Sequence, residues 1–392
     1  MKKIKNLFML AAAIVMVAGF TACGDKDEII IPTPVPVIVE DPEEPSNIEL
    51  YQRQVDAAVK AEKAHNKVIL LVAFGSTWQQ AYDAFDNTRA EYKTAFSDYD
   101  VFLSFSSAIC INRAMAAENT DARTFYEPKY WLEAFGRVQY KEIVVQSMQV
   151  IPGEEFSRVV NALKDFGNNS NGDLDDDYMA KFAFDDDGNP GENILKLGMP
   201  LLYDATTDVE ALASALHANF STYAAEGAML FMGHGNPDEY DTYKANVRYN
   251  QLETALKAKN PNYYVGTVDM EDNFKVQVHN RMVEAGFPAN GKVFCAPLMS
   301  IAGDHAHNDM AGDDDEWEPE MLTQTEGEAE DVSWKMYFTH LGYTLELDTY
   351  VDNGDRALVK GLLEYENVRN LYKAHTANAV TLDYYHSRLP EE

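Results

Sequence analysis

The sequence predicts an α/β protein of two similar, doubly wound lobes with parallel sheets around a cleft. Three observations lead to this fold class: short apolar runs alternate with helical patterns, these runs have no polar face, and the whole pattern occurs twice. A strand covered by helices on both faces is apolar along its whole length. Strands that alternate with helices form parallel β-α-β units.

The first half of the body begins with the continuous apolar run VILLVAF at residues 68–74, which we expect to be a buried strand. Aromatic residues in the following stretch predict a helix at residues 77–96. Further strands are expected at residues 101–105, 142–150 and 196–202, and a further helix at residues 129–136.

The second half repeats this alternation. Strands are expected at residues 228–232, 263–268 and 292–299, and a helix at residues 274–285. A long helix is expected at residues 237–259, with Asn236 as its cap and Pro237 in its first turn.

Two motifs of the first half recur, in the same order, in the second half. LLVAFGS aligns with AMLFMGH, which places Gly75 over Gly233. VVQSMQVIPGEE aligns with VFCAPLMSIAGDH, which places Gly153 over Gly303. We interpret this repeat as an internal duplication of an α/β half.

The overlay also pairs residues of different chemistry at two strand ends. Ser76 falls at the place of His234, and Glu155 falls at the place of His305. Because only the second half has histidine at both places, we expect the chemistry to belong to the second half.

Residues 1–23 have the pattern of an export signal. Three lysines precede an apolar stretch at residues 7–20, and Thr21-Ala22-Cys23 follows. Small residues directly before a cysteine favour a lipoprotein signal over a plain secretory signal with an incidental cysteine. We therefore expect an exported protein, held at the periplasmic or outer-membrane surface by a lipid on Cys23.

The remaining chain divides by composition. Residues 24–47 are rich in proline and acidic residues, and we expect them to form an extended linker. We expect the N-terminal lobe at residues 48–203, with an acidic insertion at 167–191. The C-terminal lobe is expected at residues 204–392, with an acidic insertion at 313–331 and the metal site.

The charge of the chain excludes one class of partner. Its formal net charge is −32, from 64 acidic and 32 basic residues. Such a surface repels phosphate backbones, so we expect no nucleic acid partner. It attracts cations diffusely, without defining a site.

Cys110 and Cys295 are the two cysteines beyond Cys23, and each lies in an apolar run. A disulfide between them is an alternative in an oxidising compartment, but two buried thiols are favoured. The sequence leaves the oligomeric state open, and a homo-oligomer is one alternative.

Three loops at strand ends carry candidate metal-ligating residues. His234 lies between two glycines, His305 lies in the sequence GDHAHND, and Asp269 ends the run YYVGTVD. In open α/β sheets, ligands collect outside the carboxyl ends of the strands, and neutral imidazole suits cobalt, nickel, iron or zinc. A single loop histidine is as often an ordinary hydrogen-bonded residue, so the convergence of three residues predicts the site. His307 is a weaker candidate.

Other chemistries lack their motifs. GSTW at residues 75–78 is not a G-x-S-x-G elbow, so a serine hydrolase is not indicated. The chain has no G-x-x-x-x-G-K-[ST] loop and no G-x-G-x-x-G loop, so nucleotide binding is not indicated.

The same segments carry a family resemblance. ILLVAFGSTW, VVQSMQVIPGEEF, LGMPLL, FMGHGN, VGTVD, APLMSIAGDHAHNDMAGDD and SWKM occur in that order between residues 67 and 374. Together they resemble the anaerobic sirohydrochlorin cobalt chelatases, the CbiK-like class II chelatases. The resemblance implies a chelatase-like fold of two α/β lobes around a tetrapyrrole cleft, and a role in cobalamin or tetrapyrrole metabolism.

The resemblance also implies roles for the candidate residues. His234 and His305 would bind the metal substrate, Co²⁺ first and iron or nickel as alternatives, and His234 would take up pyrrole protons. Asp269 stands where the family usually has a glutamate that binds the metal. Its carboxylate is one methylene shorter, so Glu271 is an alternative.

The predicted export departs from the resemblance, because a biosynthetic cobalt chelatase is expected in the cytoplasm. Three hypotheses about function therefore stay open: a chelatase acting outside the cytoplasm, a haem- or tetrapyrrole-binding protein without turnover, and a metal-scavenging surface lipoprotein.

Overall fold

A computed structural model describes residues 47–115, 123–185, 188–270, 272–313, 332–351, 357–382 and 389–390. The predicted signal at residues 1–23, almost all of the predicted linker, Glu271 and nearly all of the insertion at residues 313–331 lie outside the described residues.

The first lobe is built on a four-stranded parallel sheet with the strand order β2-β1-β3-β4. Its strands are β1 (Lys67–Ala73), β2 (Asp100–Phe105), β3 (Glu142–Ser147) and β4 (Ile194–Gly198). The second lobe has a parallel sheet with the order β6-β5-β7-β8. Its strands are β5 (Ala228–Gly233), β6 (Tyr263–Thr267), β7 (Lys292–Leu298) and β8 (Thr344–Leu347). The two sheets therefore have the same topology, as the repeated motifs predict.

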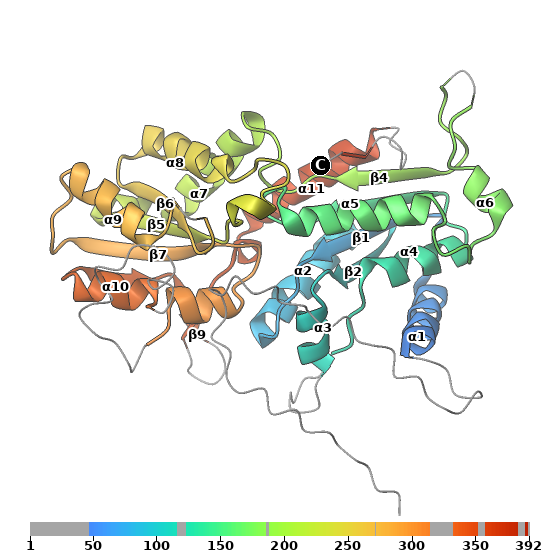
Figure 1. Cartoon of the computed structure of the whole chain (residues 1–392), viewed down its shortest axis with the longest axis horizontal. Helices are drawn as coiled ribbons and strands as arrows, with labels where there is room; N and C mark the ends of the chain where they lie inside the picture. The colour runs from blue at the N-terminus through green and yellow to red at the C-terminus, as the bar shows by residue number, and fades with distance from the viewer. Residues whose placement is uncertain are drawn as a thin grey trace, which may run out of the picture.

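Helices surround both sheets, and the two lobes lie side by side in Figure 1. The helices within the first lobe's sequence are α1 (Asn47–Glu62), α2 (Gln79–Ala95), α3 (Ala108–Met115), α4 (Pro128–Arg137), α5 (Glu154–Gly167) and α6 (Asp176–Ala180). Those that follow are α7 (Thr207–Glu226), η1 (Asp238–Tyr240), α8 (Val247–Lys259), α9 (Lys275–Glu284), η2 (Ala306–Met310), α10 (Trp334–His340), η5 (Leu362–Glu364) and α11 (Glu366–Val380). An antiparallel pair, β9 (Thr349–Val351) and β10 (Ala357–Val359), lies outside the two sheets.

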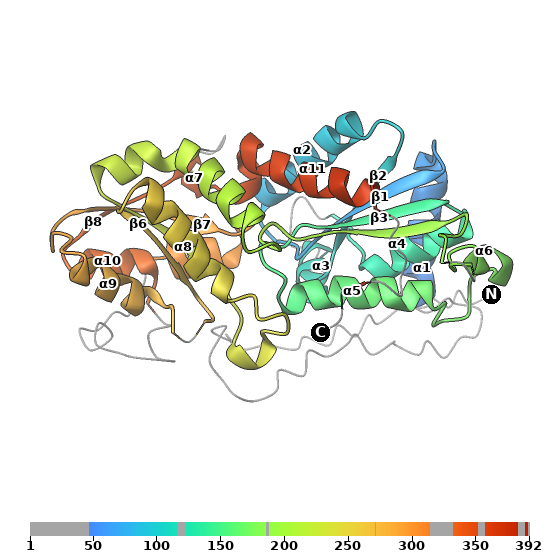
Figure 2. The ribbon, with the colours of Figure 1, turned by 90° about the horizontal axis from the view of Figure 1, so that it is seen from above.

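Successive side chains of a strand point to opposite faces of the sheet. Val68, Leu70 and Val72 of β1 pack into a core with α1, α4 and α5, whereas Ile69 and Leu71 pack toward α2 and α11. Figure 2 shows α2 and α11 on one side of the first sheet and α4 and α5 on the other. The core on the α2 and α11 side continues into the face of the second sheet that α7 and α8 cover. The lobes therefore share one hydrophobic core.

The C-terminal helix crosses between the lobes. By sequence, α11 belongs to residues 204–392, which we assigned to the C-terminal lobe, yet it packs against β3 and β4 of the first sheet as well as α7. The Tyr372 hydroxyl donates a hydrogen bond to the carbonyl of Met148 (3.1 Å), directly after β3. This helix joins the two lobes behind the cleft.

The prediction of one long helix at residues 237–259 is wrong for its first half. Only η1 and then α8 are helical there. The Asp241 carboxylate accepts the backbone N–H groups of Ala245 (2.7 Å) and Asn246 (3.3 Å), and Lys244 has a positive φ of 54°. This local turn competes with continuation of the helix. Asn236 does not cap the segment that follows it, because Pro237 precedes η1 and Asn246 precedes α8. Its Oδ1 instead accepts the backbone N–H of Glu154 (3.4 Å), at the start of α5.

The insertion at residues 167–191 is more ordered than a solvated surface loop. It contains α6, and the side chains of Leu174, Tyr178 and Phe182 are buried in the first lobe's core. The Tyr178 hydroxyl donates to the carbonyl of Tyr140 (2.7 Å). Apolar residues scattered among the acidic ones therefore dock this segment onto the sheet.

Cys110 and Cys295 are unpaired thiols, as favoured from the sequence, but only Cys295 is fully buried and Cys110 is partly exposed. Within the described ranges, no helix combines the length and the apolar character that a membrane span needs.

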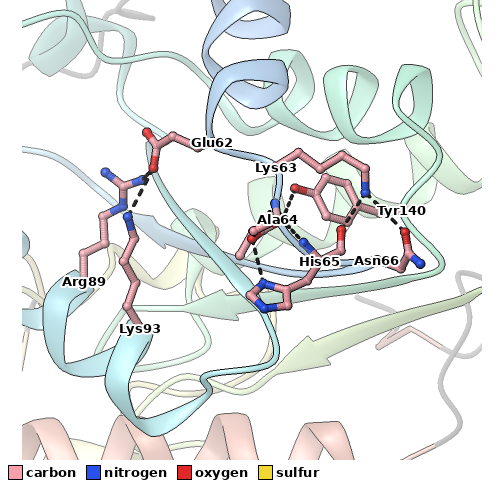
Figure 3. A network of polar contacts seen from close by, with 9 residues as sticks. Glu62, Lys63, Ala64, His65, Asn66, Arg89, Lys93 and Tyr140 are labelled. Carbon is pink, nitrogen blue, oxygen red and sulfur yellow. Dashed lines mark hydrogen bonds and ion pairs between the residues drawn. The ribbon is translucent and has the colours of Figure 1, made fainter.

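A polar network fixes the amino-terminal edge of the first sheet (Figure 3). Asp100, at the start of β2, accepts hydrogen bonds from the Tyr140 hydroxyl (2.6 Å), His65 Nδ1 (2.9 Å) and the backbone N–H groups of Ala64 (3.0 Å) and His65 (3.1 Å). Burial alone would raise the pKa of Asp100, but these hydrogen bonds outweigh burial and lower it. The ionised carboxylate thus ties the segment between α1 and β1 to the start of β2.

Replacing Asp100 by Asn should lower the free energy of unfolding by about 1–3 kcal/mol at neutral pH, because buried donors lose a charged acceptor. A lowered pKa in the folded state stabilises the protein above the usual aspartate pKa of about 3.9, and this stabilisation is lost as the pH falls through the folded-state pKa. Denaturant unfolding at several pH values measures the effect, with the exposed Asp98→Asn as control. Equal losses in both variants would contradict the assignment.

Candidate functional site

A cleft lies between the lobes at the carboxyl ends of both sheets. Its volume is about 1190 Å³, which exceeds the roughly 300–1,000 Å³ of ordinary small-molecule pockets. The loops after β1 and β3 line it from the first lobe, and the loops after β5, β6 and β7 line it from the second. All three predicted ligands, His234, Asp269 and His305, line this cleft.

His234 stands on a tight loop directly after β5. Gly235 has a φ of 81°, in the left-handed region that favours glycine, and a Cβ on Gly233 would lie 2.4 Å from the Tyr249 ring. His234 Nδ1 lies 3.1 Å from Asp269 Oδ2 and 2.8 Å from the carbonyl oxygen of Gly235. Both neighbours are acceptors, so Nδ1 carries the hydrogen in the neutral ring. The Nε2 lone pair is then available to a metal or a proton.

His305 follows β7, the neighbour of β5 in the sheet. Its ring centroid lies 4.7 Å from that of His234, and the two rings are nearly perpendicular, at 88°. His305 Nδ1 contacts the carboxylate of Asp309, four residues later. This carboxylate fixes the same tautomer as in His234, an arrangement typical of metal-binding histidines.

Charges around His305 favour its protonated form. Burial would lower the pKa of His305, but the hydrogen bond and charge of Asp309, together with the charges of Asp269 and Asp304, raise it. A proton therefore competes with a metal ion for His305 at a higher pH than for an ordinary histidine.

Asp269 has a contact that the sequence did not indicate. Its carboxylate is largely buried, with 15% of the side chain exposed, and Oδ2 lies 3.1 Å from His234 Nδ1. Its neighbour Glu271, the alternative ligand, lies outside the described residues. Within the described part of the chain, no three or more His, Cys, Asp and Glu side chains are grouped so that they could hold a metal ion.

Glu155 is a further residue of the site. The overlay of the two halves paired it with His305, but it was not among the predicted metal-ligating residues. It lies in the first turn of α5 and reaches the cleft from the lobe opposite the histidines. Ser106 Oγ donates to its carboxylate (3.0 Å), and Arg158 Nη1 lies 3.5 Å away. Burial raises the pKa of Glu155, against smaller opposing effects of Arg158, Ser106 and His234. The alignment of Gly153 with Gly303 was the available signal.

The cleft is strongly acidic. The carboxylates among its described lining residues are Glu154, Glu155, Asp269, Asp304, Asp309 and Asp313. Arg113 is the single lysine or arginine among these lining residues. A wall of one sign of charge raises the local concentration of counter-ions, so the cleft attracts cations.

Comparisons with known proteins agree with the resemblance. A model of the cobalt chelatase (CbiK) family matches residues 67–381. The sirohydrochlorin cobaltochelatase of Salmonella typhimurium is 24% identical over 318 residues, which cover 81% of this chain and 97% of that protein. The sirohydrochlorin cobaltochelatase CbiKC of Nitratidesulfovibrio vulgaris is 29% identical over 252 residues, which cover 64% of this chain and 77% of that protein. Among solved structures, SirB from Bacillus subtilis with Fe³⁺ aligns with a TM-score of 0.45 and 11% identity, covering 81% of this chain and 99% of SirB.

Replacing Asp309 by Asn should lower the pKa of His305, because the neutral amide no longer stabilises the imidazolium. An NMR titration of the histidine side chains measures this pKa, which in the unchanged protein should lie above the usual value of about 6.5. Asp313→Asn, in an exposed carboxylate paired with Lys335, is the control. A His305 pKa unaffected by the Asp309 change would refute the role of this carboxylate.

Proposed function

Because this chain belongs to the cobalt chelatase (CbiK) family, we propose that it is a metal chelatase of the sirohydrochlorin cobaltochelatase type. The observation that carries the proposal is the pair of histidines at the ends of β5 and β7, each with Nδ1 held by a carboxylate and Nε2 available. The substrates are a divalent metal ion, cobalt first, and a tetrapyrrole. Iron and nickel remain alternatives, because imidazole suits all three metals.

The metal would be bound by the Nε2 atoms of His234 and His305. The acidic cleft attracts the cation and repels anions of the solvent. Two imidazoles leave coordination positions open, which suits a metal ion that must pass to the pyrrole nitrogens. Asp269 either binds the metal as its family counterpart does or orients His234 through Nδ1.

Metal insertion releases two pyrrole protons, and the cleft offers an acceptor for each. When the metal–nitrogen bond to His234 breaks, Nε2 regains its lone pair and can take one proton. Glu155, across the cleft, can take the second, because its raised pKa makes the carboxylate a better base. Charge is then balanced: one divalent cation enters the macrocycle and two protons leave it.

The predicted export signal favours a second candidate. Outside the cytoplasm, the same cleft could bind haem or another tetrapyrrole without turnover, or capture metal ions alone. Absorption spectra separate these functions. Haem binding gives a shifted spectrum without conversion, and metal capture gives a signal with cobalt and none with tetrapyrrole.

Turnover tests the chelatase proposal. With cobalt and sirohydrochlorin, His234→Ala and His305→Ala should lower kcat/KM by about 100-fold or more, and Glu155→Gln by about 10- to 100-fold, because each removes a metal ligand or proton acceptor. The absorption spectrum followed over time measures conversion, with His340→Ala, an exposed residue of α10, as control. Conversion by the unchanged protein no faster than in the protein-free mixture would rule out the enzyme.

We further propose that the protein is exported and anchored through a lipid on Cys23, on the basis of residues 1–23. Replacing Cys23 by Ser should abolish incorporation of a labelled fatty acid and release the protein from the membrane fraction. Cys110→Ser is the matched control. Fatty acid incorporation that survives the Cys23 change would contradict the anchor.

A further inference from the structure

The segment that carries His305 is held by the opposite lobe at the residue directly before it. Asp304 Oδ1 accepts a hydrogen bond from Trp78 Nε1 (2.7 Å), and Asp304 Oδ2 lies 3.3 Å from Arg113 Nη1. Trp78 precedes α2 and Arg113 lies near the end of α3, so both belong to the first lobe. A single carboxylate of the second lobe thus joins two separate elements of the first.

The same segment is held again two residues after His305. The His307 ring stacks on Trp78, with centroids 3.7 Å apart and planes within 10°. His307 Nε2 lies 3.1 Å from Gln80 Nε2, and Nδ1 lies 2.9 Å from the carbonyl oxygen of Gly303. Contacts with the first lobe therefore flank His305 on both sides in the sequence, while His305 itself faces Asp309 and His234.

The ion pair between Arg113 and Asp304 is largely exposed to solvent. Arg113 and Asp304 both line the cleft, and their side chains are 63% and 47% exposed. Exposed ion pairs contribute little to stability and weaken with salt. The buried core that the two lobes share holds them together, so the contacts of Asp304 and His307 with the first lobe serve the local placement of residues 303–309 more than overall folding.

We propose that Trp78, Arg113, Asp304 and His307 form an interlobe latch that positions His305 toward His234 for metal binding. Trp78, Arg113 and Asp304 are positioning residues: they act on the metal through the backbone on either side of His305. The proposal rests on the proposed function only in assigning the metal to the histidine pair. The latch is itself a property of the protein without substrates.

Replacing Arg113 by Gln distinguishes a positioning role of Arg113 from a direct effect of its charge on the metal. Removing a positive charge from an acidic cleft should strengthen cobalt binding if Arg113 acts only through space. If Arg113 positions His305 by holding Asp304, the same change should weaken cobalt binding, by about threefold or more. Trp78→Phe keeps an aromatic ring against His307 but removes the N–H donor, and it should weaken binding in the same direction.

The experiment uses the protein without tetrapyrrole and reads two quantities. Cobalt affinity is measured from the visible absorption of bound Co²⁺, and the mobility of residues 303–309 is measured by amide hydrogen exchange. Arg123→Gln is the matched control, because Arg123 pairs with Asp86 (2.6 Å) in an exposed contact within the first lobe. Arg113→Lys, which retains a cation, should recover part of the lost affinity.

Faster exchange and weaker cobalt binding in Arg113→Gln and Trp78→Phe, with Arg123→Gln unchanged, is the expected result. Unchanged hydrogen exchange of residues 303–309 in both variants would show that these contacts do not form a latch. Faster exchange with unchanged or tighter cobalt binding would overturn its role in positioning His305. If the unchanged protein binds no cobalt, the proposed function fails, while the exchange measurement still decides whether the latch exists.

Discussion

The side-by-side carboxyl ends of β5 and β7 are the constraint on which the site depends. Parallel pairing forces both strands to end at the same edge of the sheet, so the loops that follow must lie next to each other. The glycines around His234 allow the first loop to turn within this space. The perpendicular histidine rings, 4.7 Å apart, are the consequence.

The duplicated fold supplies the opposite wall of the cleft. The first sheet has the same topology, so its strand ends face the same cavity, but they carry Ser76 and Glu155 where the second sheet carries histidines. One lobe can therefore hold the metal while the other offers a carboxylate for protons. The two faces of a flat macrocycle would meet different chemistry, which is what metal insertion with proton release requires.

Most of the fold could be predicted from the sequence, because buried parallel strands are apolar throughout and both halves repeat. The prediction of one helix at residues 237–259 failed because hydrogen bonds to the Asp241 side chain stabilise a turn in place of a continuous helix. The histidines were identifiable because each follows a strand. The contact of Asp269 with His234 could not be predicted, because it depends on how two separate loops fold back toward each other, and no local sequence pattern encodes that. The packing of α11 on the first lobe is likewise a long-range contact.

We expect His234 and His305 to bind the metal substrate together through Nε2. Cobalt X-ray absorption of the protein loaded with one equivalent of Co²⁺ tests it most directly, because imidazole gives a characteristic scattering pattern. Two imidazole nitrogens should lie in the first coordination shell, and one fewer in His234→Ala or in His305→Ala. A shell of oxygen ligands alone, or a spectrum unchanged in both variants, would contradict it.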